Sequence, residues 1–379
     1  MDFSYSEEQE LLRNSVARFL ADNYSFETFR NVSRSEPGWR RAIWKQFAEL
    51  GLLGASLPEA FGGLGGSAVE TMIVMEAFGR ALVVEPYVPT VVIAGGLLRA
   101  AGSEPQKQEW LPRIASGDAV IAFAFAEPQG RYNLADLATT ARKHGAGFVL
   151  NGQKAVVIGA PFADALIVTA RTSGERRDNS GVSVFLVDAR AKGVSRRDYP
   201  TMDGLRASEI TFENVEVPAE NLIGRHDDAL SVIEQITDEA IAAHCAEALG
   251  AMRVMQESTV EYSKTRKQFG VPIGKFQVLQ HRMVDMFMQV EQSASMVLMV
   301  TLKLGERAQE RKKAASATKV QVGRAGRFVG QGAVQILGGM GMTDELALGH
   351  YFKRVTMIDT LYGNTDHHLA RYASLQKRS

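Results

Sequence analysis

The first third of the chain carries apolar residues at helical spacing. Ser6 opens the first such stretch, because Glu7 and Glu8 follow it and apolar residues then recur every three or four positions. A glycine-rich segment, Pro58 to Ser67, reads as a loop. Further helices are expected at about residues 39–50, 67–79, 88–101 and 107–116. The pattern predicts an N-terminal α-helical domain over residues 1–117.

At Asp118 the pattern changes to short runs of β-branched and aromatic residues. Runs such as "AVIAFAFAE", "GFVLNGQKAVVIG" and "GVSVFLVD" are separated by Gly, Asn and Asp. This spacing predicts an antiparallel β domain over residues 118–226. Because no helix-length segment interrupts these runs, a doubly wound nucleotide-binding sheet is not expected.

From Ala229 the helical spacing returns over much longer segments. Helices are expected at about 229–263, 277–308, 312–337 and 347–359. Long neighbouring amphipathic helices indicate a bundle, and the charged stretch from Gly305 to Lys313 reads as a solvated turn between two of them. The predicted fold class is therefore α+β, with a C-terminal four-helix bundle over residues 227–379.

Composition limits the possible partners. The chain has 43 basic and 43 acidic residues, and neither a basic run nor a zinc-finger spacing is present, so neither nucleic acid nor a metal ion is expected to bind. Cys245 is the single cysteine, which excludes an internal disulfide and fits a reducing cytoplasm. We interpret Cys245 as a small, buried apolar residue. No apolar run approaches the roughly 20 residues that span a bilayer, and the acidic N-terminus does not read as a signal peptide.

Five motifs occur in a fixed order along the chain. They are "PEAFGGLGG" from Pro58, "AEPQGRYNLADLATTAR" from Ala126, "NGQK" from Asn151, "TRKQFG" from Thr265 and "QILGGMG" from Gln335. In this order they resemble the acyl-CoA dehydrogenases over essentially the whole chain. "ETMIVMEAFGRALVVEPY" and "GHYFKRVTMIDTL" look most like the small subunit of pimeloyl-CoA dehydrogenase-like enzymes. The resemblance implies an FAD cofactor, α,β-dehydrogenation of acyl-CoA thioesters, an electron-transfer flavoprotein as acceptor, and a homo- or hetero-tetramer.

In that family, FAD lies across a subunit interface, and one chain supplies contacts to the pyrophosphate and adenine. The resemblance carries this role to Arg266, Gln268, Phe269, Gln277, Gln335, Gly338 and Gly339. Arg266 offers a permanently charged donor fork for a pyrophosphate oxygen. Gly338 and Gly339 lack a Cβ and so permit close approach of the backbone. This half of the predicted FAD site looks intact.

The half that would face the flavin ring departs from the family. Ala126 replaces a family threonine, and bulky residues occupy Gln129–Asn133, where the family has "GAGSD". After "NGQK" the family has an aromatic residue and a threonine, and this chain has Val156 and Ile158. Apolar side chains donate no hydrogen bond to a flavin.

The largest difference from the family is at the positions of its catalytic base. Tyr362 falls at the usual glutamate position, Ala240 at the alternative one, and Ile241 where the family often has arginine. A tyrosine with a reference pKa near 10 is a poor base at neutral pH, so no catalytic residue is predicted. Carboxylates that could substitute are expected to cap helices or face solvent, and a histidine pair is expected at the surface or beside a phosphate. They are Asp238, Glu239, Asp359 and Asp366, and His367 and His368.

Three hypotheses follow from this contrast. The first is a subunit that completes the FAD site of a partner chain. The second is a self-sufficient homo-oligomeric acyl-CoA dehydrogenase with an atypical base. The third is a non-enzymatic scaffold without FAD, against which the retained Arg266 and Gln335 motifs argue. A visible spectrum of the chain expressed alone would separate the first two.

Overall fold

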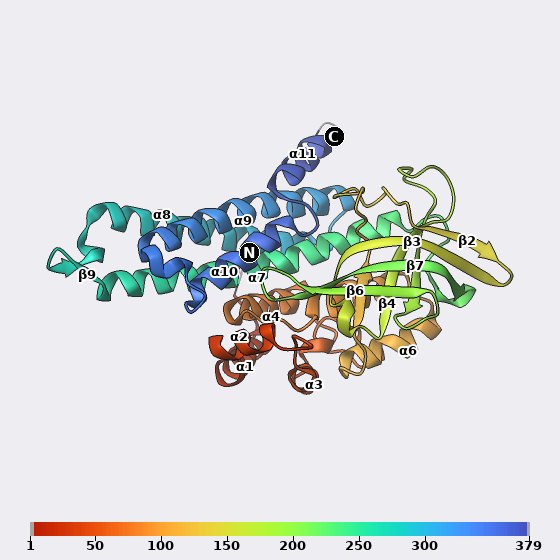
Figure 1. Ribbon diagram of the computed structural model, residues 1–379, viewed down its shortest axis with the longest axis horizontal. Helices are drawn as coiled ribbons and strands as arrows, with labels where there is room; N and C mark the ends of the chain where they lie inside the picture. Colours follow the sequence, from red (N-terminus) through yellow and green to blue (C-terminus); the bar gives the residue numbers. More distant parts are fainter. Residues whose placement is uncertain (1–3, 377–379) are drawn as a thin grey trace. The chain divides into compact units, whose positions relative to one another are not determined.

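The computed structural model describes residues 4–376. These residues form two compact units (Figure 1). The first combines the chain up to Asn31, Ala68–Val83 and the chain from Ile241 onward, and the second combines Val32–Ser67 with Val84–Ala240. The fold is the predicted α+β class, with a helical N-terminal part, a middle β-sheet and a C-terminal helical part. The domain bounds 1–117, 118–226 and 227–379 stay a prediction.

A β-sheet of eight strands is the centre of the second unit, in the order β6-β7-β3-β2-β4-β5-β8 with β1 beside β4. The strands are β1 (Ile121–Ala124), β2 (Thr140–His144), β3 (Gly147–Ile158), β4 (Ala165–Arg171), β5 (Val182–Asp188), β6 (Val194–Pro200), β7 (Arg206–Pro218) and β8 (Leu222–Ile223). Alternate side chains pack into a core, where the Phe148 and Phe185 rings meet edge to face at 4.9 Å. The sheet is mainly antiparallel, as predicted, but β1 pairs with β4 in parallel.

Helices of the second unit include α3 (Arg41–Glu49), α5 (Gly95–Ala101) and α6 (Glu104–Ala115), with a π-helix at Val88–Ala94 before α5. Ser103 and Gln106 form a capping box at the start of α6, and this explains why the helix begins there. The Gln106 amide also donates to the carbonyls of Glu220 and Leu222, at 2.7 and 3.1 Å. One residue thus caps the helix and fastens it to the segment that enters β8.

The first unit is helical. It contains α1 (Glu7–Asn23), α4 (Ala68–Ala81), part of α7 (Leu230–Thr265), α8 (Gln277–Lys303), α9 (Ala308–Leu337), α10 (Ala347–Thr360) and α11 (Thr365–Gln376). Glycines let α4 and α7 pack backbone to backbone. A Cβ on Gly79 would meet the Glu247 carbonyl at 1.9 Å, and one on Gly250 would meet the Glu76 carbonyl at 2.0 Å. Substitution of either glycine would force the two helices apart.

The structure adds elements that the pattern did not predict. Helices α2 (Phe26–Arg34) and α11 are short, so they carry too few apolar repeats to stand out. The stretch from Gly305 to Lys313 is not a solvated turn throughout, because α9 begins at Ala308 and buries Arg311. Within residues 4–376, no helix is long and apolar enough to cross a membrane, and no cluster of His, Cys, Asp or Glu is arranged to hold a metal ion.

Candidate functional site

A two-stranded hairpin follows α7 and carries three of the predicted FAD residues. Strands β9 (Lys267–Gln268) and β10 (Val271–Pro272) are joined by a tight turn at Phe269 and Gly270, whose φ angles are +52° and +80°. Positive φ is strained for phenylalanine. The Phe269 side chain is nonetheless 93% exposed. The Arg266 carbonyl accepts from the Ile273 amide at 2.8 Å, which closes the base of the hairpin.

The end of α9 carries three further predicted FAD residues. Gln335 is exposed in the last turn of the helix, and a 3₁₀ turn follows at Gly338–Met342. Gly338 has a φ of +63°, and no atom lies within 4 Å of a Cβ built on it or on Gly339. This backbone is therefore open to close approach by another molecule.

All seven predicted FAD residues belong to the first unit and are exposed. Gln277, the seventh, is the first residue of α8. Within residues 4–376, the side chains of Arg266, Gln277 and Gln335 have no hydrogen-bond partner. A guanidinium, three amides, an aromatic ring and open glycine backbone are the donors and surfaces that suit a pyrophosphate and an adenine. The residues present thus fit the predicted half of the FAD site.

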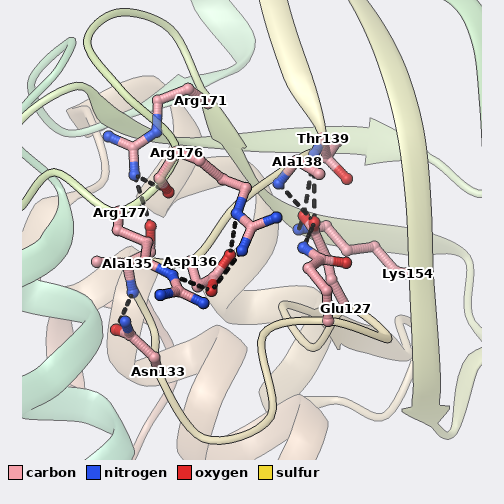
Figure 2. Close-up of polar contacts among 11 residues, drawn as sticks. Glu127, Asn133, Ala135, Asp136, Ala138, Thr139, Lys154, Arg171, Arg176 and Arg177 are labelled. Carbon is pink, nitrogen blue, oxygen red and sulfur yellow. Dashed lines mark hydrogen bonds and ion pairs between the residues drawn. The ribbon is translucent and has the colours of Figure 1, made fainter.

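The loop after β1 lies in the second unit, where the predicted flavin-ring residues are. Figure 2 shows the ion pair between Glu127, near the start of this loop, and Lys154 on β3, with 2.7 Å between Oε1 and Nζ and both side chains buried. The Ala138 and Thr139 amides donate to the same carboxylate, at 2.6 and 3.2 Å. Lys154 Nζ also donates to Thr169 Oγ1 at 3.0 Å.

Burial and charge oppose each other in this pair. Burial alone would raise the pKa of Glu127, but the Lys154 ammonium outweighs it and holds that pKa below its usual range. Burial lowers the pKa of Lys154 to about 8, and Glu127 only partly offsets this. The pair is ionised at neutral pH. For Lys154, the free-energy cost of burial exceeds the stabilisation by the Glu127 carboxylate.

A second set of contacts fastens the other end of this loop (Figure 2). Asp136 is buried, and its two oxygens lie 2.8 Å from Arg176 Nε and 2.7 Å from Arg177 Nε. Arg171 Nη2 donates to the Ala135 carbonyl at 2.6 Å. The motif analysis missed these arginines because they come from a different segment of the chain. Side chains from other segments thus hold both ends of the loop, with Lys154 at one end and Arg176 and Arg177 at the other.

The predicted flavin-side positions include two strained residues. Val156 has a φ of +51° at a register shift between β3 and β7, and its side chain is exposed. Arg131 has a φ of +48° and is also exposed. Positive φ is a genuine outlier for a β-branched residue such as valine. Ala126 is partly buried, and its carbonyl accepts from the Ala155 amide at 2.8 Å. Ile158 ends β3 and is partly buried.

Tyr362, at the predicted base position, follows α10 with a φ of +57°. Its ring lies against the His244 ring, with 5.9 Å between centroids and 27° between planes. Burial raises the pKa of the Tyr362 phenol above its usual range, so it stays protonated at neutral pH. Ala240, at the alternative position, is completely buried and offers only a methyl group.

A buried network of three polar side chains lies beside Tyr362, and no sequence motif predicted it. His244 Nδ1 lies 2.9 Å from Glu247 Oε2 on the same helix, and Arg354 Nη1 on α10 lies 2.6 Å from Glu247 Oε1. Arg354 Nη1 also donates to the Val83 carbonyl at 3.0 Å. One sequence feature could have indicated this pair, which is a histidine and a glutamate three residues apart in the apolar stretch "IAAHCAEALG".

Two residues fix the turn that carries Tyr362. Lys319 Nζ on α9 donates to the Ile358 carbonyl, and to the Leu361 carbonyl at 2.7 Å, so it caps the end of α10. His368 Nε2 donates to the Tyr362 carbonyl at 3.1 Å, and Nδ1 lies 3.2 Å from Ser316 Oγ. Burial lowers the pKa of Lys319 to about 8 and that of His368 to about 3. The prediction that His368 lies at the surface is wrong, because its ring is buried and donates a hydrogen bond to this turn.

The other carboxylates considered as substitutes are engaged elsewhere or exposed. Glu239 pairs with Arg99 at 2.8 Å, and Asp359 accepts from Thr365 Oγ1 at 3.0 Å. Asp366 is exposed in the first turn of α11, as predicted. Asp238 neither caps a helix nor faces solvent, because it lies within α7 and is fully buried. Cys245 is buried as predicted, and burial raises its pKa to about 12.

Comparisons with known proteins match the chain from end to end. Models of the acyl-CoA dehydrogenase N-terminal, middle and C-terminal domains match residues 6–118, 122–215 and 230–374. Acyl-CoA dehydrogenase FadE12 of Mycobacterium tuberculosis is 31% identical over 350 residues, which are 90% of this chain and 89% of that protein.

Solved structures share the fold over the whole chain. The ChsE4-ChsE5 complex from Mycobacterium tuberculosis contains a chain with a TM-score of 0.91 and 25% identity, over 100% of both chains. The FAD complex of PigA gives the same TM-score and identity, again over 100% of both chains. The chain belongs to the acyl-CoA dehydrogenase family, whose cofactor is FAD.

Proposed function

We propose that the chain is a subunit that completes the FAD site of a partner chain in an acyl-CoA dehydrogenase acting on acyl-CoA thioesters. The observation that carries this proposal is the hairpin at Arg266–Gly270. It presents a 93% exposed phenylalanine on strained backbone, next to an arginine without a side-chain partner among the described residues. An exposed aromatic residue in a strained turn is expected where a second molecule covers it.

The roles of the hairpin and of the α9 end follow from their chemistry. FAD, when bound, would supply the acceptor for the hydride that leaves the β-carbon of the acyl group. Arg266 would neutralise a pyrophosphate oxygen, because a guanidinium stays charged at any working pH. The amides of Gln268, Gln277 and Gln335 would pair with phosphate and adenine edges. Phe269 would cover an apolar face, and Gly338 would admit the cofactor to the backbone.

The opposite half of the site explains why a partner is proposed. Ala126 and Ile158 offer no hydroxyl to a flavin ring, and Val156 is held at a strained bulge. Tyr362 is protonated at neutral pH, so the usual proton acceptor is missing. A chain that keeps one half of a shared site and loses the other is suited to serve a neighbour whose own half is complete.

The proposed assembly is a hetero-tetramer with a second acyl-CoA dehydrogenase chain, located in the cytoplasm and passing electrons to an electron-transfer flavoprotein. The similar ChsE4-ChsE5 structure is a complex of two differently named chains, which supports a two-chain assembly. The long helices of the first unit would carry the interface. They expose apolar side chains, including Val278, Val284, Phe287 and Met288 on α8.

A second candidate is a homo-oligomer that carries out dehydrogenation by itself with an atypical base. One observation favours it, which is the ordered His244–Glu247 pair against Tyr362.

The experiment that separates the two candidates is isolation of the native complex with flavin counted per chain. A complex of two chain types with one FAD for each pair supports the partner subunit. Copies of this chain alone, each with one FAD that acyl-CoA bleaches, would establish the homo-oligomer and refute the proposal.

A further inference from the structure

His244 is a buried imidazole with one nitrogen fixed and the other available. Its Nδ1 lies 2.9 Å from Glu247 Oε2, and its side chain is almost fully buried in α7. Among residues 4–376, the structure gives Nε2 no hydrogen-bond partner. One face of the ring is covered by Tyr362.

The protonation of Glu247 decides which nitrogen of His244 carries the hydrogen. Burial alone would raise the pKa of Glu247, but Arg354 and His244 outweigh it and hold the pKa below its usual range. An ionised carboxylate can only accept hydrogen bonds, so His244 Nδ1 must donate. In the neutral form of the ring, Nε2 is then the nitrogen whose lone pair can accept a proton. Arg354 holds the second carboxylate oxygen and keeps Glu247 in place.

This arrangement is that of an oriented general base. A histidine changes charge nearest neutral pH among side chains, and a carboxylate on Nδ1 sets the tautomer and stabilises the imidazolium that forms. Both positions where the family carries its base are neighbours of His244. Tyr362 is in ring contact with it, and Ala240 precedes it in α7 by four residues, which is one helical turn.

We propose that His244 is a general base that removes and returns the α-proton of an acyl thioester bound by this chain. The Nε2 lone pair takes the proton, and the electron pair of the C–H bond moves into the thioester carbonyl to give an enolate. Return of a proton from the imidazolium restores the starting thioester. The cycle needs no oxidant or reductant, because the only net change in D2O is exchange of hydrogen for deuterium.

This inference rests on the proposed function only for the substrate class, an acyl-CoA thioester. The experiment uses the full chain purified without a partner, so that no second active site contributes to exchange, and phenylacetyl-CoA, whose ring makes the α-proton more acidic. Exchange is followed by proton NMR in D2O, and the dissociation constant of the thioester is measured separately. His244→Gln should lower the exchange rate by at least about a hundredfold, the usual contribution of a positioned base, with the dissociation constant nearly unchanged.

Glu247→Gln tests the positioning role of the carboxylate. It should reduce exchange about tenfold, and ¹⁵N NMR should show that His244 loses its preference for the Nδ1–H tautomer, a signal that a purely structural role would not move. His144→Gln, at an exposed histidine at the end of β2, is the matched control and should exchange like the parent.

Two outcomes would overturn the proposal. The first is parental exchange in a folded His244→Gln chain, which would make the contacts of His244 with Glu247 purely structural. The second is the absence of phenylacetyl-CoA binding to this chain. Flavin content is counted separately in the native complex, so failure of the proposed FAD role is recognised independently of exchange.

Discussion

The buried ion pair between Lys154 and Glu127 supports a test of how the predicted flavin-side loop is held. In Lys154→Met, the carboxylate keeps the Ala138 and Thr139 amides but loses the ammonium with which it forms its ion pair. Removing one partner of a buried pair typically costs 3–5 kcal/mol, because the other charge stays buried without compensation. We expect a loss of about 3–5 kcal/mol in the free energy of unfolding of the second unit.

The double variant, Glu127→Gln with Lys154→Met, should recover much of this loss. Burial lowers the pKa of Lys154 from 10.5 to about 8 although Glu127 raises it, so the ammonium is buried at a net cost in free energy. Removing both charges relieves that cost, while the glutamine oxygen still accepts from the two amides. The free energy of unfolding of the double variant should therefore lie within about 2 kcal/mol of the parent value. The coupling energy between the two substitutions should be at least about 2 kcal/mol.

Tryptophan fluorescence in urea is a suitable assay, because Trp39, Trp44 and Trp110 all lie in the second unit. Their emission reports unfolding of the unit that contains the ion pair. A loss below about 1 kcal/mol in Lys154→Met, or strictly additive effects in the double variant, would show that the two buried charges do not depend on each other. The pair would then contribute no more than an exposed one.

Further predictions concern the FAD site and the turn at Tyr362. Arg266→Ala should weaken FAD binding to the complex by roughly 1.5–3 kcal/mol, whereas the control Lys267→Ala on the same hairpin should leave it unchanged. Equal retention of FAD by both variants would show that Arg266 does not bind FAD. Tyr362→Phe should leave steady-state dehydrogenation by the complex nearly unchanged, and a hundredfold loss with flavin retained would make the phenol part of the chemistry. Because the pKa of Lys319 is lowered to about 8, folding stability should rise between pH 8 and 10.5. Lys319→Met should lose about 3 kcal/mol of that rise in urea titrations, and an unchanged rise would show that Lys319 does not titrate there.

Helical and strand periodicity predicted the layout of the fold because the long elements repeat their apolar positions many times. Helix α7 and the sheet strands were recognisable for this reason. The parallel pairing of β1 with β4 could not be predicted from the sequence. All four residues of β1 are buried, so the strand has no alternation that indicates its direction. Short helices such as α11 were missed for a similar lack of repeats.

The candidate site was predictable where a motif is continuous in sequence. Arg266 and Phe269 lie on one hairpin, which the sequence pattern did not predict, and their role in FAD binding stays a prediction. The His244–Glu247–Arg354 chain was not predicted, because Arg354 is 107 residues from Glu247 and only the packing of α10 against α7 joins them. The arginines that hold Asp136 come from a loop about 40 residues away. Long-range pairs of this kind have no local signature.

The proposal that this chain completes the FAD site of a different chain is tested by the ratio of FAD to polypeptide in the native complex, with each chain type identified by mass. We expect two chain types, one FAD for each pair, and loss of that FAD when Arg266 in this chain is changed to alanine. A complex made only of this chain, with one FAD per copy, would contradict it.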